Sequence, residues 1–313
     1  MKKEDVSIAM KWKRLYRKLR RPFEWFGIAL ALAILPSLSR KGVIRLAHGL
    51  ADIGYLFDRY GKKVARANLR LMFGSRLTPR REAALIRRSY RNMARVLINV
   101  VWMSRNTRKR LADQVSFNPS VLKTLLDNLP AITISGHLGN WEILSQACVA
   151  QGVPMMSIAK QIGSKEMTKR LIRLRSTIGQ QLVPAEGALR PMLYALKHGT
   201  SLGLLVDQHT NIEEGGTWVT LFGVPAEMSM APAALARKTK TTLIFAWSRP
   251  LKDGGFITWD NQEIVAVSKP NITAKEAVEF YILVESTLPQ GFSSDPDVET
   301  LSDGRISIKG CAD

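Results

Sequence analysis

One short segment of the chain, residues 131–142, combines a histidine and a carboxylate at the end of an apolar run. His137 lies between Gly136 and Gly139, and these glycines let the backbone turn sharply and approach a ligand closely. An imidazole can take a proton from a hydroxyl group when a carboxylate holds its other ring nitrogen in the correct tautomer. The residue types therefore predict a general base, His137, and an acid that orients it, Glu142.

The spacing of this pair limits the structures in which it can work. Glu142 follows His137 by five residues, which on one continuous helix would separate the two side chains by about 140°. If His137 lies in a loop and Asn140 caps the next helix, Glu142 falls in the first turn and can point back at the imidazole. The alternative is a histidine whose ring is hydrogen-bonded near a helix N-terminus and that has no catalytic role. The flanking glycines and the position at a strand end favour catalysis.

The sequence does not indicate a nucleophilic serine or cysteine. It contains no Gly-x-Ser-x-Gly elbow, and Cys148 and Cys311 are far apart without metal-like spacing. We therefore expect direct attack by an acceptor hydroxyl, without a disulfide framework, a metal ion or another cofactor.

The elements that would position this pair follow from the pattern after residue 130. Short apolar runs predict buried strands at 131–135, 154–159, 202–206 and 242–248. Helices are predicted between and after them, at 140–151, 164–178, 188–198, 229–239 and 274–288. Strands that alternate with helices of this length predict an α/β fold with a mostly parallel sheet covered by helices.

The first 125 residues have a helical pattern. The clearest prediction is an amphipathic helix over 78–103, with Thr78 as its N-cap and Pro79 at its first position. Six arginines accompany its apolar stripe, with only Glu82 opposing them: Arg80, Arg81, Arg87, Arg88, Arg91 and Arg95. This cationic face suits anionic lipid or an acidic protein, and the alternative is a solvated helix face.

The N-terminus has the order of a membrane-associating segment. Nine Lys or Arg residues within residues 1–21 precede an apolar stretch at 22–38. The unbroken apolar run from Trp25 to Leu35 is shorter than the roughly 20 residues of a spanning helix, so we expect a retained shallow, tilted or re-entrant anchor. A buried helix of a soluble domain is the alternative.

The net charge of the chain indicates anionic partners but does not distinguish between them. The formal net charge of +20 suggests nucleic acid, phospholipid or acidic carrier proteins. No recognised nucleic-acid-binding motif accompanies the charge, so we expect no nucleic acid partner. We divide the chain into a helical region (1–125), an α/β domain (126–290) and an acidic tail (291–313) that we expect to be disordered.

The segment 136–142 resembles the signature of the late acyltransferases of lipid A biosynthesis. This lauroyl/myristoyl transferase family lies within the HxxxxD/E glycerolipid (lysophospholipid) acyltransferase superfamily. Further blocks similar to the family's occur in its order at 68–73, 175–193, 204–208 and 222–237. The resemblance covers about residues 25–290 and implies a glycerolipid acyltransferase-like fold.

The resemblance also implies an activity and a site. A fatty acyl group would pass from acyl carrier protein, or acyl-CoA, to a hydroxyl of a lipid A precursor, at the cytoplasmic face of the bacterial inner membrane. His137 would be the general base and Glu142 its partner. The residues implied in substrate binding are Gly139, Asn140, Arg175, Arg190, Asp207, Gln208, Gly223, Pro225, Ala226, Ser229 and Arg237. The arginines would contact phosphate or the carrier, and Gly223, Pro225 and Ala226 would shape the pocket wall.

The chain departs from the family pattern at three places. Asn99 stands where an acid is usual, and Lys160 where an arginine is usual. After Gln290 the acidic tail replaces an aromatic, basic closing segment, for which we hypothesise a frameshift or truncation in the gene. Two alternatives therefore stay open: an acceptor that is another phospholipid or glycolipid, and a family member with impaired catalysis.

Overall fold

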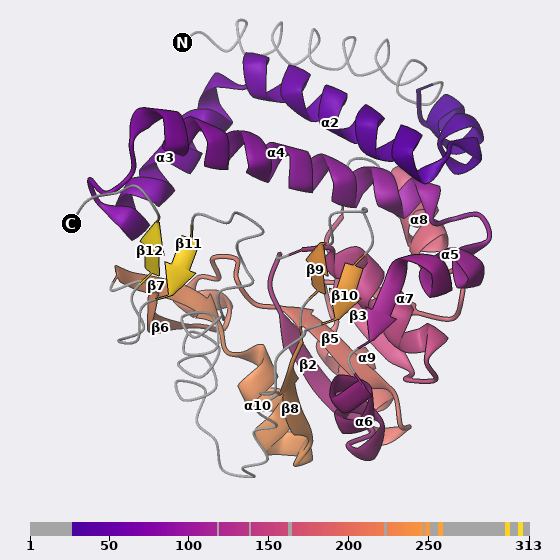
Figure 1. The fold of residues 1–313 in the computed structure, drawn as a ribbon. Helices are drawn as coiled ribbons and strands as arrows, with labels where there is room; N and C mark the ends of the chain where they lie inside the picture. The colour runs from indigo at the N-terminus through magenta and orange to yellow at the C-terminus, as the bar shows by residue number, and fades with distance from the viewer. Residues whose placement is uncertain are drawn as a thin grey trace, which may run out of the picture.

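A five-stranded sheet forms the centre of the computed structural model, which describes residues 27–117, 119–137, 139–161, 165–221, 224–246, 248–250, 256–258, 298–300 and 306–308. Every neighbouring pair in this sheet is parallel. The strands, in their order across the sheet, are β4 (Gln181–Pro184), β3 (Met155–Ala159), β5 (Ser201–Leu205), β2 (Ala131–Ser135) and β8 (Thr242–Phe245). Helices cover the sheet (Figure 1), which confirms the predicted α/β class.

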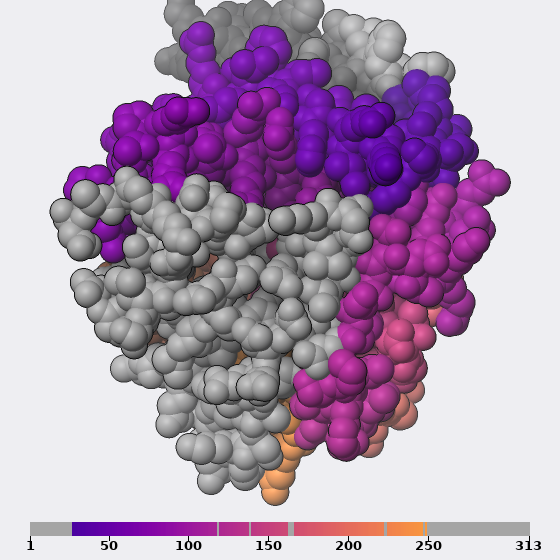
Figure 2. Space-filling model, viewed as in Figure 1, coloured from indigo at the N-terminus to yellow at the C-terminus, as the bar shows by residue number. Residues whose placement is uncertain are grey.

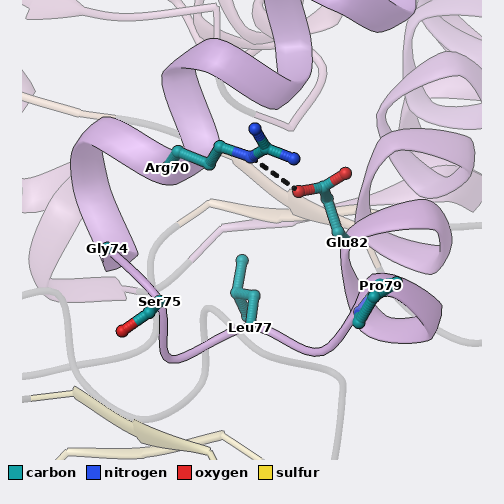
Figure 3. A pocket seen from close by; sticks show the side chains of 6 residues that line it. All are labelled: Arg70, Gly74, Ser75, Leu77, Pro79 and Glu82. Carbon is teal, nitrogen blue, oxygen red and sulfur yellow. Dashed lines mark ion pairs between the residues drawn. The ribbon is translucent and has the colours of Figure 1, made fainter.

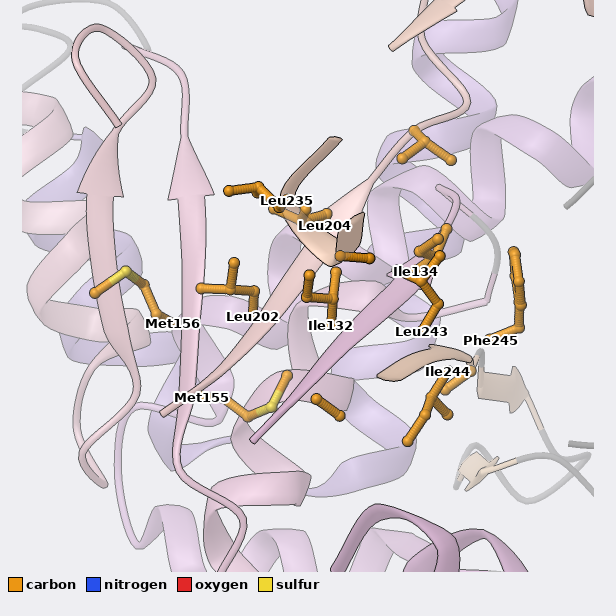
Figure 4. Close-up of a cluster of buried hydrophobic side chains, with 14 of the residues drawn as sticks. Ile132, Ile134, Met155, Met156, Leu202, Leu204, Leu235, Leu243, Ile244 and Phe245 are labelled. Atoms are coloured by element: carbon orange, nitrogen blue, oxygen red, sulfur yellow. The ribbon is translucent and has the colours of Figure 1, made fainter. Parts of the chain in front are cut away.

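The interior strand β2 is apolar because both faces of the sheet are covered. All five of its residues are buried, and Ile132 and Ile134 lie in the main hydrophobic core (Figure 4). The helices that pack on the sheet are α7 (Trp141–Ala150) on β3, α9 (Leu189–Lys197) on β5 and α10 (Ala231–Thr239) on β8 and β2. Helix α6 (Pro119–Asp127) adds Val121 and Leu125 to the same core, and α8 (Lys165–Arg175) follows β3.

The predicted strands and helices of this domain lie within a few residues of the observed ones, with three differences. The predicted strand at 242–248 is two strands, because β8 ends at Phe245 and β9 (Ser248–Pro250) joins another sheet. Strand β4 was not predicted. Neither was the antiparallel hairpin of β6 (Gly216–Leu221) and β7 (Val224–Ser229), which includes part of the predicted helix 229–239. The helix predicted at 274–288 lies outside the described residues.

The N-terminal region forms a layer of helices across one end of the sheet (Figure 1). Residues 27–34 are helical, and a single 3-10 turn (Leu35–Ser37) leads into the next helices. These are α2 (Arg40–Phe57), α3 (Arg59–Phe73), α4 (Pro79–Trp102) and α5 (Thr107–Gln114). The predicted cap of α4 is confirmed, since the Thr78 hydroxyl accepts a hydrogen bond from the Arg81 amide and Pro79 opens the helix.

Small residues bring α2 close to α4. Val43, Ala47 and Ala51 are the buried residues of α2, and α2 packs along α4. Asp52 of α2 accepts paired hydrogen bonds from both Arg87 and Arg91, at 2.7 to 2.9 Å. The bonds from these two arginines hold the pKa of the Asp52 carboxyl well below its usual range.

These contacts neutralise part of the predicted cationic face of α4. Arg87 and Arg91 are paired with Asp52, while burial of Arg95 lowers the pKa of its guanidinium. The same helix therefore uses part of its positive charge to hold α2 in place.

A second hydrophobic cluster joins this layer to the α/β part of the chain. It contains Val43, Trp102 and Leu111 from the N-terminal region together with Ile143 and Ala147 of α7. Strand β1 (Val115–Phe117) also pairs with β10 (Phe256–Thr258), which pairs with β9. The division at residues 125 and 126 stays a prediction.

Two expectations concern the ends of the chain. The basic segment 1–21 and the first five residues of the apolar stretch, 22–26, lie outside the described residues. Within the described ranges, no helix combines the length and apolar character needed to cross a bilayer. In the region expected to be disordered, β11 (Val298–Thr300) and β12 (Ile306–Ile308) form an antiparallel pair.

Candidate active site

The imidazole of His137 is bound by a carboxylate from the neighbouring strand. Strands β2 and β5 run side by side in parallel, with Ser135 opposite Leu205, so the residues after them meet at one edge of the sheet. Asp207 accepts a hydrogen bond from His137 Nδ1 at 2.8 Å through Oδ1. Its Oδ2 accepts the backbone N–H of His137 at 2.7 Å. One carboxylate thus fixes both the ring and the backbone of the candidate base.

This contact determines the tautomer of His137. An ionised carboxylate only accepts hydrogen bonds, so Nδ1 carries the proton and Nε2 of the neutral ring has a free electron pair. The amide nitrogen of Gln208 lies 3.2 Å from Nε2 and donates to it. About a quarter of the His137 side chain is exposed, and the Trp141 ring contacts its edge at 4.7 Å between centroids. The nitrogen that could accept a proton therefore lies at the surface of the site.

The predicted partner of His137, Glu142, has a different contact. It lies in the first turn of α7 as expected, but its Oε2 forms an ion pair with Nε of Arg175, at 2.5 Å. Asp207, not Glu142, binds Nδ1, because the sheet brings Asp207 to the imidazole from the adjacent strand. The prediction that Glu142 holds the imidazole is therefore corrected by the geometry.

The ion pair of Glu142 and Arg175 is largely buried. Both side chains are only 15% exposed. Burial raises the pKa of the Glu142 carboxyl, and the positive charge of Arg175 opposes that rise. Arg175, predicted to contact phosphate or the carrier, is thus the counter-ion of Glu142 and connects the end of α8 to the start of α7.

The loop after β2 is held from three directions. Gly139 has φ +58, and a Cβ atom there would lie 1.6 Å from the Ser248 carbonyl oxygen, so only glycine fits. The Ser248 hydroxyl accepts the Asn140 N–H at 2.8 Å, and Asn92 of α4 donates to the Gly139 carbonyl at 3.2 Å. Asn140 is fully buried and caps α7 by accepting the Ile143 N–H at 3.2 Å, as predicted. These bonds fix the loop that carries His137.

The remaining predicted site residues lie on other elements. Arg190 and Arg237 are exposed, on the first turn of α9 and the last turn of α10, and among the described residues no hydrogen bond or ion pair joins them to His137. Pro225 and Ala226 lie on β7, opposite Thr220 and Val219 of β6. Ser229 accepts the Ala231 N–H at 3.3 Å and so shapes the start of α10. Gly223 lies outside the described residues.

Three residues of the site were not predicted in their observed roles. Asp207 was expected to orient substrate, yet its position after a predicted strand was the available signal for a contact with His137. Trp141 lies within the motif, and its aromatic ring beside a histidine was a weaker signal. Ser248 supports the loop from β9, and nothing in the sequence around it indicates that contact.

A family model matches most of this chain, and single relatives match less than two fifths of it. A family model described as bacterial lipid A biosynthesis acyltransferase matches residues 9–256. A phosphatidylinositol mannoside acyltransferase of Mycobacterium tuberculosis is 25% identical over 124 residues, 38% of this chain and 39% of that protein. A protein of the same description from Mycolicibacterium smegmatis is 24% identical over 117 residues, 36% of this chain and 38% of that protein. The matched part thus spans about two fifths of these relatives.

Proposed function

The chain belongs to the bacterial lipid A biosynthesis acyltransferase family, and on that premise we propose that it transfers a fatty acyl group from a thioester donor to a hydroxyl group of a membrane lipid. The observation that carries this proposal is the double contact of Asp207 with His137, which leaves Nε2 ready to accept a proton.

The reaction begins at Nε2 of His137. The acceptor hydroxyl takes the place of the Gln208 amide beside Nε2, and its proton passes to the ring as its oxygen bonds to the thioester carbonyl carbon. The negative charge of Asp207 stabilises the imidazolium that forms. The carbon–sulfur bond then breaks, and the imidazolium returns the proton to the departing thiolate. The products are an ester and a free thiol.

The ion pair of Glu142 and Arg175 has a supporting part in this scheme. It joins the first turn of α7, next to the base, to the end of α8. Because Arg175 is engaged by Glu142, we do not assign it to a phosphate of the substrate. Arg190 and Arg237 are exposed and remain our candidates for contacts with an anionic donor or acceptor.

We propose acyl carrier protein or acyl-CoA as the donor and a lipid A precursor as the acceptor. Both kinds of donor are anionic, and the chain has a formal net charge of +20. Family membership favours the lipid A precursor. The reaction would take place at the cytoplasmic face of the bacterial inner membrane, where a soluble donor and a lipid acceptor meet.

The second acceptor that we propose is a phosphatidylinositol mannoside or a related glycolipid. The specific observation in its favour is that the relatives described above are phosphatidylinositol mannoside acyltransferases. The same base would serve either acceptor, because each offers a hydroxyl group.

The test uses purified full-length protein with radiolabelled acyl donor, carried in turn by acyl carrier protein and by CoA. Two acceptors are offered in parallel, a tetra-acylated lipid A precursor and a phosphatidylinositol mannoside. We expect acyl transfer to one acceptor that His137→Ala reduces by about 10³-fold or more. Equal rates for wild type and His137→Ala would remove His137 from the mechanism, and transfer to the mannoside alone would replace the lipid A assignment.

A further inference from the structure

Two consecutive helices, α2 and α3, carry a stripe of large apolar side chains on the protein surface. Its members are at least one third exposed, and we refer to them as the α2–α3 stripe. They are Leu46, Leu50, Ile53 and Phe57 on α2, and Tyr60 and Leu71 on α3. Phe57 and Tyr60 are 80% and 79% exposed, the highest fractions among the large apolar side chains of the described residues. Exposed apolar side chains that lie together on a surface are typical of sites of interaction.

The spacing of the stripe places it along one side of each helix. On α2, steps of four, three and four residues hold the four side chains within about 60° of arc. Tyr60 and Leu71 are eleven residues apart and lie within about 20° of each other on α3. The residues of α2 that pack against α4, Val43, Ala47 and Ala51, lie on a different part of the helix. The stripe is therefore additional to the core-facing surface of α2.

Helix α3 has the composition of a helix that lies at an interface. It contains five cations and no acid, and none of its fifteen residues is buried. The cations are Arg59, Lys62, Lys63, Arg66 and Arg70. An amphipathic helix with basic residues beside an apolar side is the form that binds in the plane of an anionic bilayer.

The polar side of α3 is tied to α4. Arg66 Nε lies 2.8 Å from Glu82 Oε1, and Arg70 Nε lies 3.5 Å from Glu82 Oε2. Figure 3 shows Arg70 pointing across to Glu82 at a cavity of about 470 Å³ between the two helices. These pairs hold α3 against the N-terminal turn of α4 through its charged side. In the space-filling view (Figure 2) the residues of α2, α3 and α4 form one band across the upper part of the molecule.

We infer that the α2–α3 stripe inserts into the head-group region of an anionic phospholipid bilayer, with both helices lying in the plane of the membrane. Lipid suits this surface better than a second copy of the chain, because a two-fold contact would bring Arg59, Lys62 and Lys63, the cations of α3 outside the pairs with Glu82, toward the same cations. The inference deepens the proposed function, since it rests on the acceptor being a membrane lipid, and it requires no spanning helix.

The test measures flotation of the full-length protein with vesicles of phosphatidylcholine, alone or mixed with an equal part of phosphatidylglycerol. Leu71→Glu is compared with Leu189→Glu, because both leucines are helical and 56% exposed while only Leu71 belongs to the stripe. We expect Phe57→Glu and Leu71→Glu to weaken binding to the mixed vesicles by about tenfold or more, and Leu189→Glu to leave it unchanged. Circular dichroism of each variant confirms that its helices are intact.

Several results would overturn the inference. Unchanged flotation of Phe57→Glu and Leu71→Glu would exclude the stripe from lipid binding. Equal binding of wild type to both vesicle types would exclude the role of the cations. If Phe57→Glu and Leu71→Glu floated like wild type but lost a dimer or lost binding to acyl carrier protein, the stripe would be assigned to a protein partner.

The same variants separate this inference from the proposed function. With an acceptor dispersed in detergent, Phe57→Glu should retain the wild-type rate, because the stripe contains no residue of the site. His137→Ala should float like wild type while losing transfer. If His137→Ala kept its activity and Phe57→Glu lost flotation, the proposed mechanism would fail and the lipid-binding surface would stand.

Discussion

Replacement of Asp207 by asparagine tests the assignment of the base directly. The carboxylate accepts two hydrogen bonds from His137, one from the ring and one from the backbone, at 2.8 and 2.7 Å. An amide has only one oxygen. If that oxygen stays on the backbone N–H, the amide NH₂ faces Nδ1 and forces the proton to Nε2, so the ring can no longer accept a proton there. If the amide turns over, its NH₂ opposes the backbone N–H and the loop must shift.

The loss of the Asp207 charge determines how much the variant should slow the reaction. A unit charge about 4 Å from the imidazolium contributes roughly 4 kcal/mol at an effective dielectric of 20. Each 1.36 kcal/mol corresponds to a tenfold change in rate, so we expect Asp207→Asn to slow the chemical step by about 10³-fold. A change of tautomer adds to this loss, and about 10⁴-fold is the effect of the corresponding change in a serine protease.

The assay is single-turnover transfer of a labelled acyl group, together with ¹⁵N NMR of the histidine side chains to read the tautomer. Glu142→Gln is the control, because Glu142 is the residue that sequence spacing assigned to the imidazole and its ion pair is instead with Arg175. We expect a smaller loss for Glu142→Gln and no change in the His137 tautomer. The reasoning is refuted if Asp207→Asn stays within tenfold of wild type while Glu142→Gln loses more.

Three further predictions concern the support of the site. Gly139→Ala should abolish transfer and lower the melting temperature, because the added Cβ meets the Ser248 carbonyl oxygen. The control is Gly152→Ala, which is also at positive φ but has open space around it. It should lower the free energy of unfolding by only about 1 to 2 kcal/mol, measured by thermal unfolding. Arg175→Met should reduce the free energy of unfolding by about 3 to 5 kcal/mol, since it leaves the Glu142 charge buried without a cation; Arg175→Met/Glu142→Leu should recover most of this loss in urea titrations. Burial raises the pKa of Glu142 in the folded state, so the native protein binds more protons than the unfolded chain at pH values just above the ordinary carboxyl range. The free energy of unfolding should therefore fall as the pH rises through this range. Glu142→Gln should remove this dependence on pH. A steeper fall of the free energy of unfolding with pH in Glu142→Gln than in the wild type would contradict the predicted direction.

The parallel sheet was predictable because its central strands are buried on both faces. Residues of β2, β3 and β5 form short continuous apolar runs, and each predicted strand lies within one residue of the observed one. Strand β4 escaped prediction because Gln181–Pro184 lies at the edge of the sheet, with its end residues exposed. An exposed edge does not need the continuous apolar run that marks a central strand.

The partner of His137 was not predictable from spacing alone. Glu142 is near in sequence, whereas Asp207 is seventy residues away and becomes a neighbour only because β5 lies beside β2. The sequence indicated the strands but not their order, and the order decides which strand ends meet. The same applies to Ser248, whose strand β9 reaches the loop from another sheet. Contacts local to one helix, such as the Thr78 and Asn140 caps, were predicted correctly.

The absence of buried residues in α3 has a consequence for proteolysis. A helix of fifteen residues is only marginally stable in water unless packing supports it, and a surface ion pair such as that of Arg66 with Glu82 adds no more than about 1 kcal/mol. Brief unfolding of α3 would expose five Lys or Arg peptide bonds to trypsin between α2 and α4. A cut there would separate these two helices in the chain while the pairs of Asp52 with Arg87 and Arg91 still held them together. Anything that covers α3, a lipid surface included, would thereby also control how long the protein survives intact.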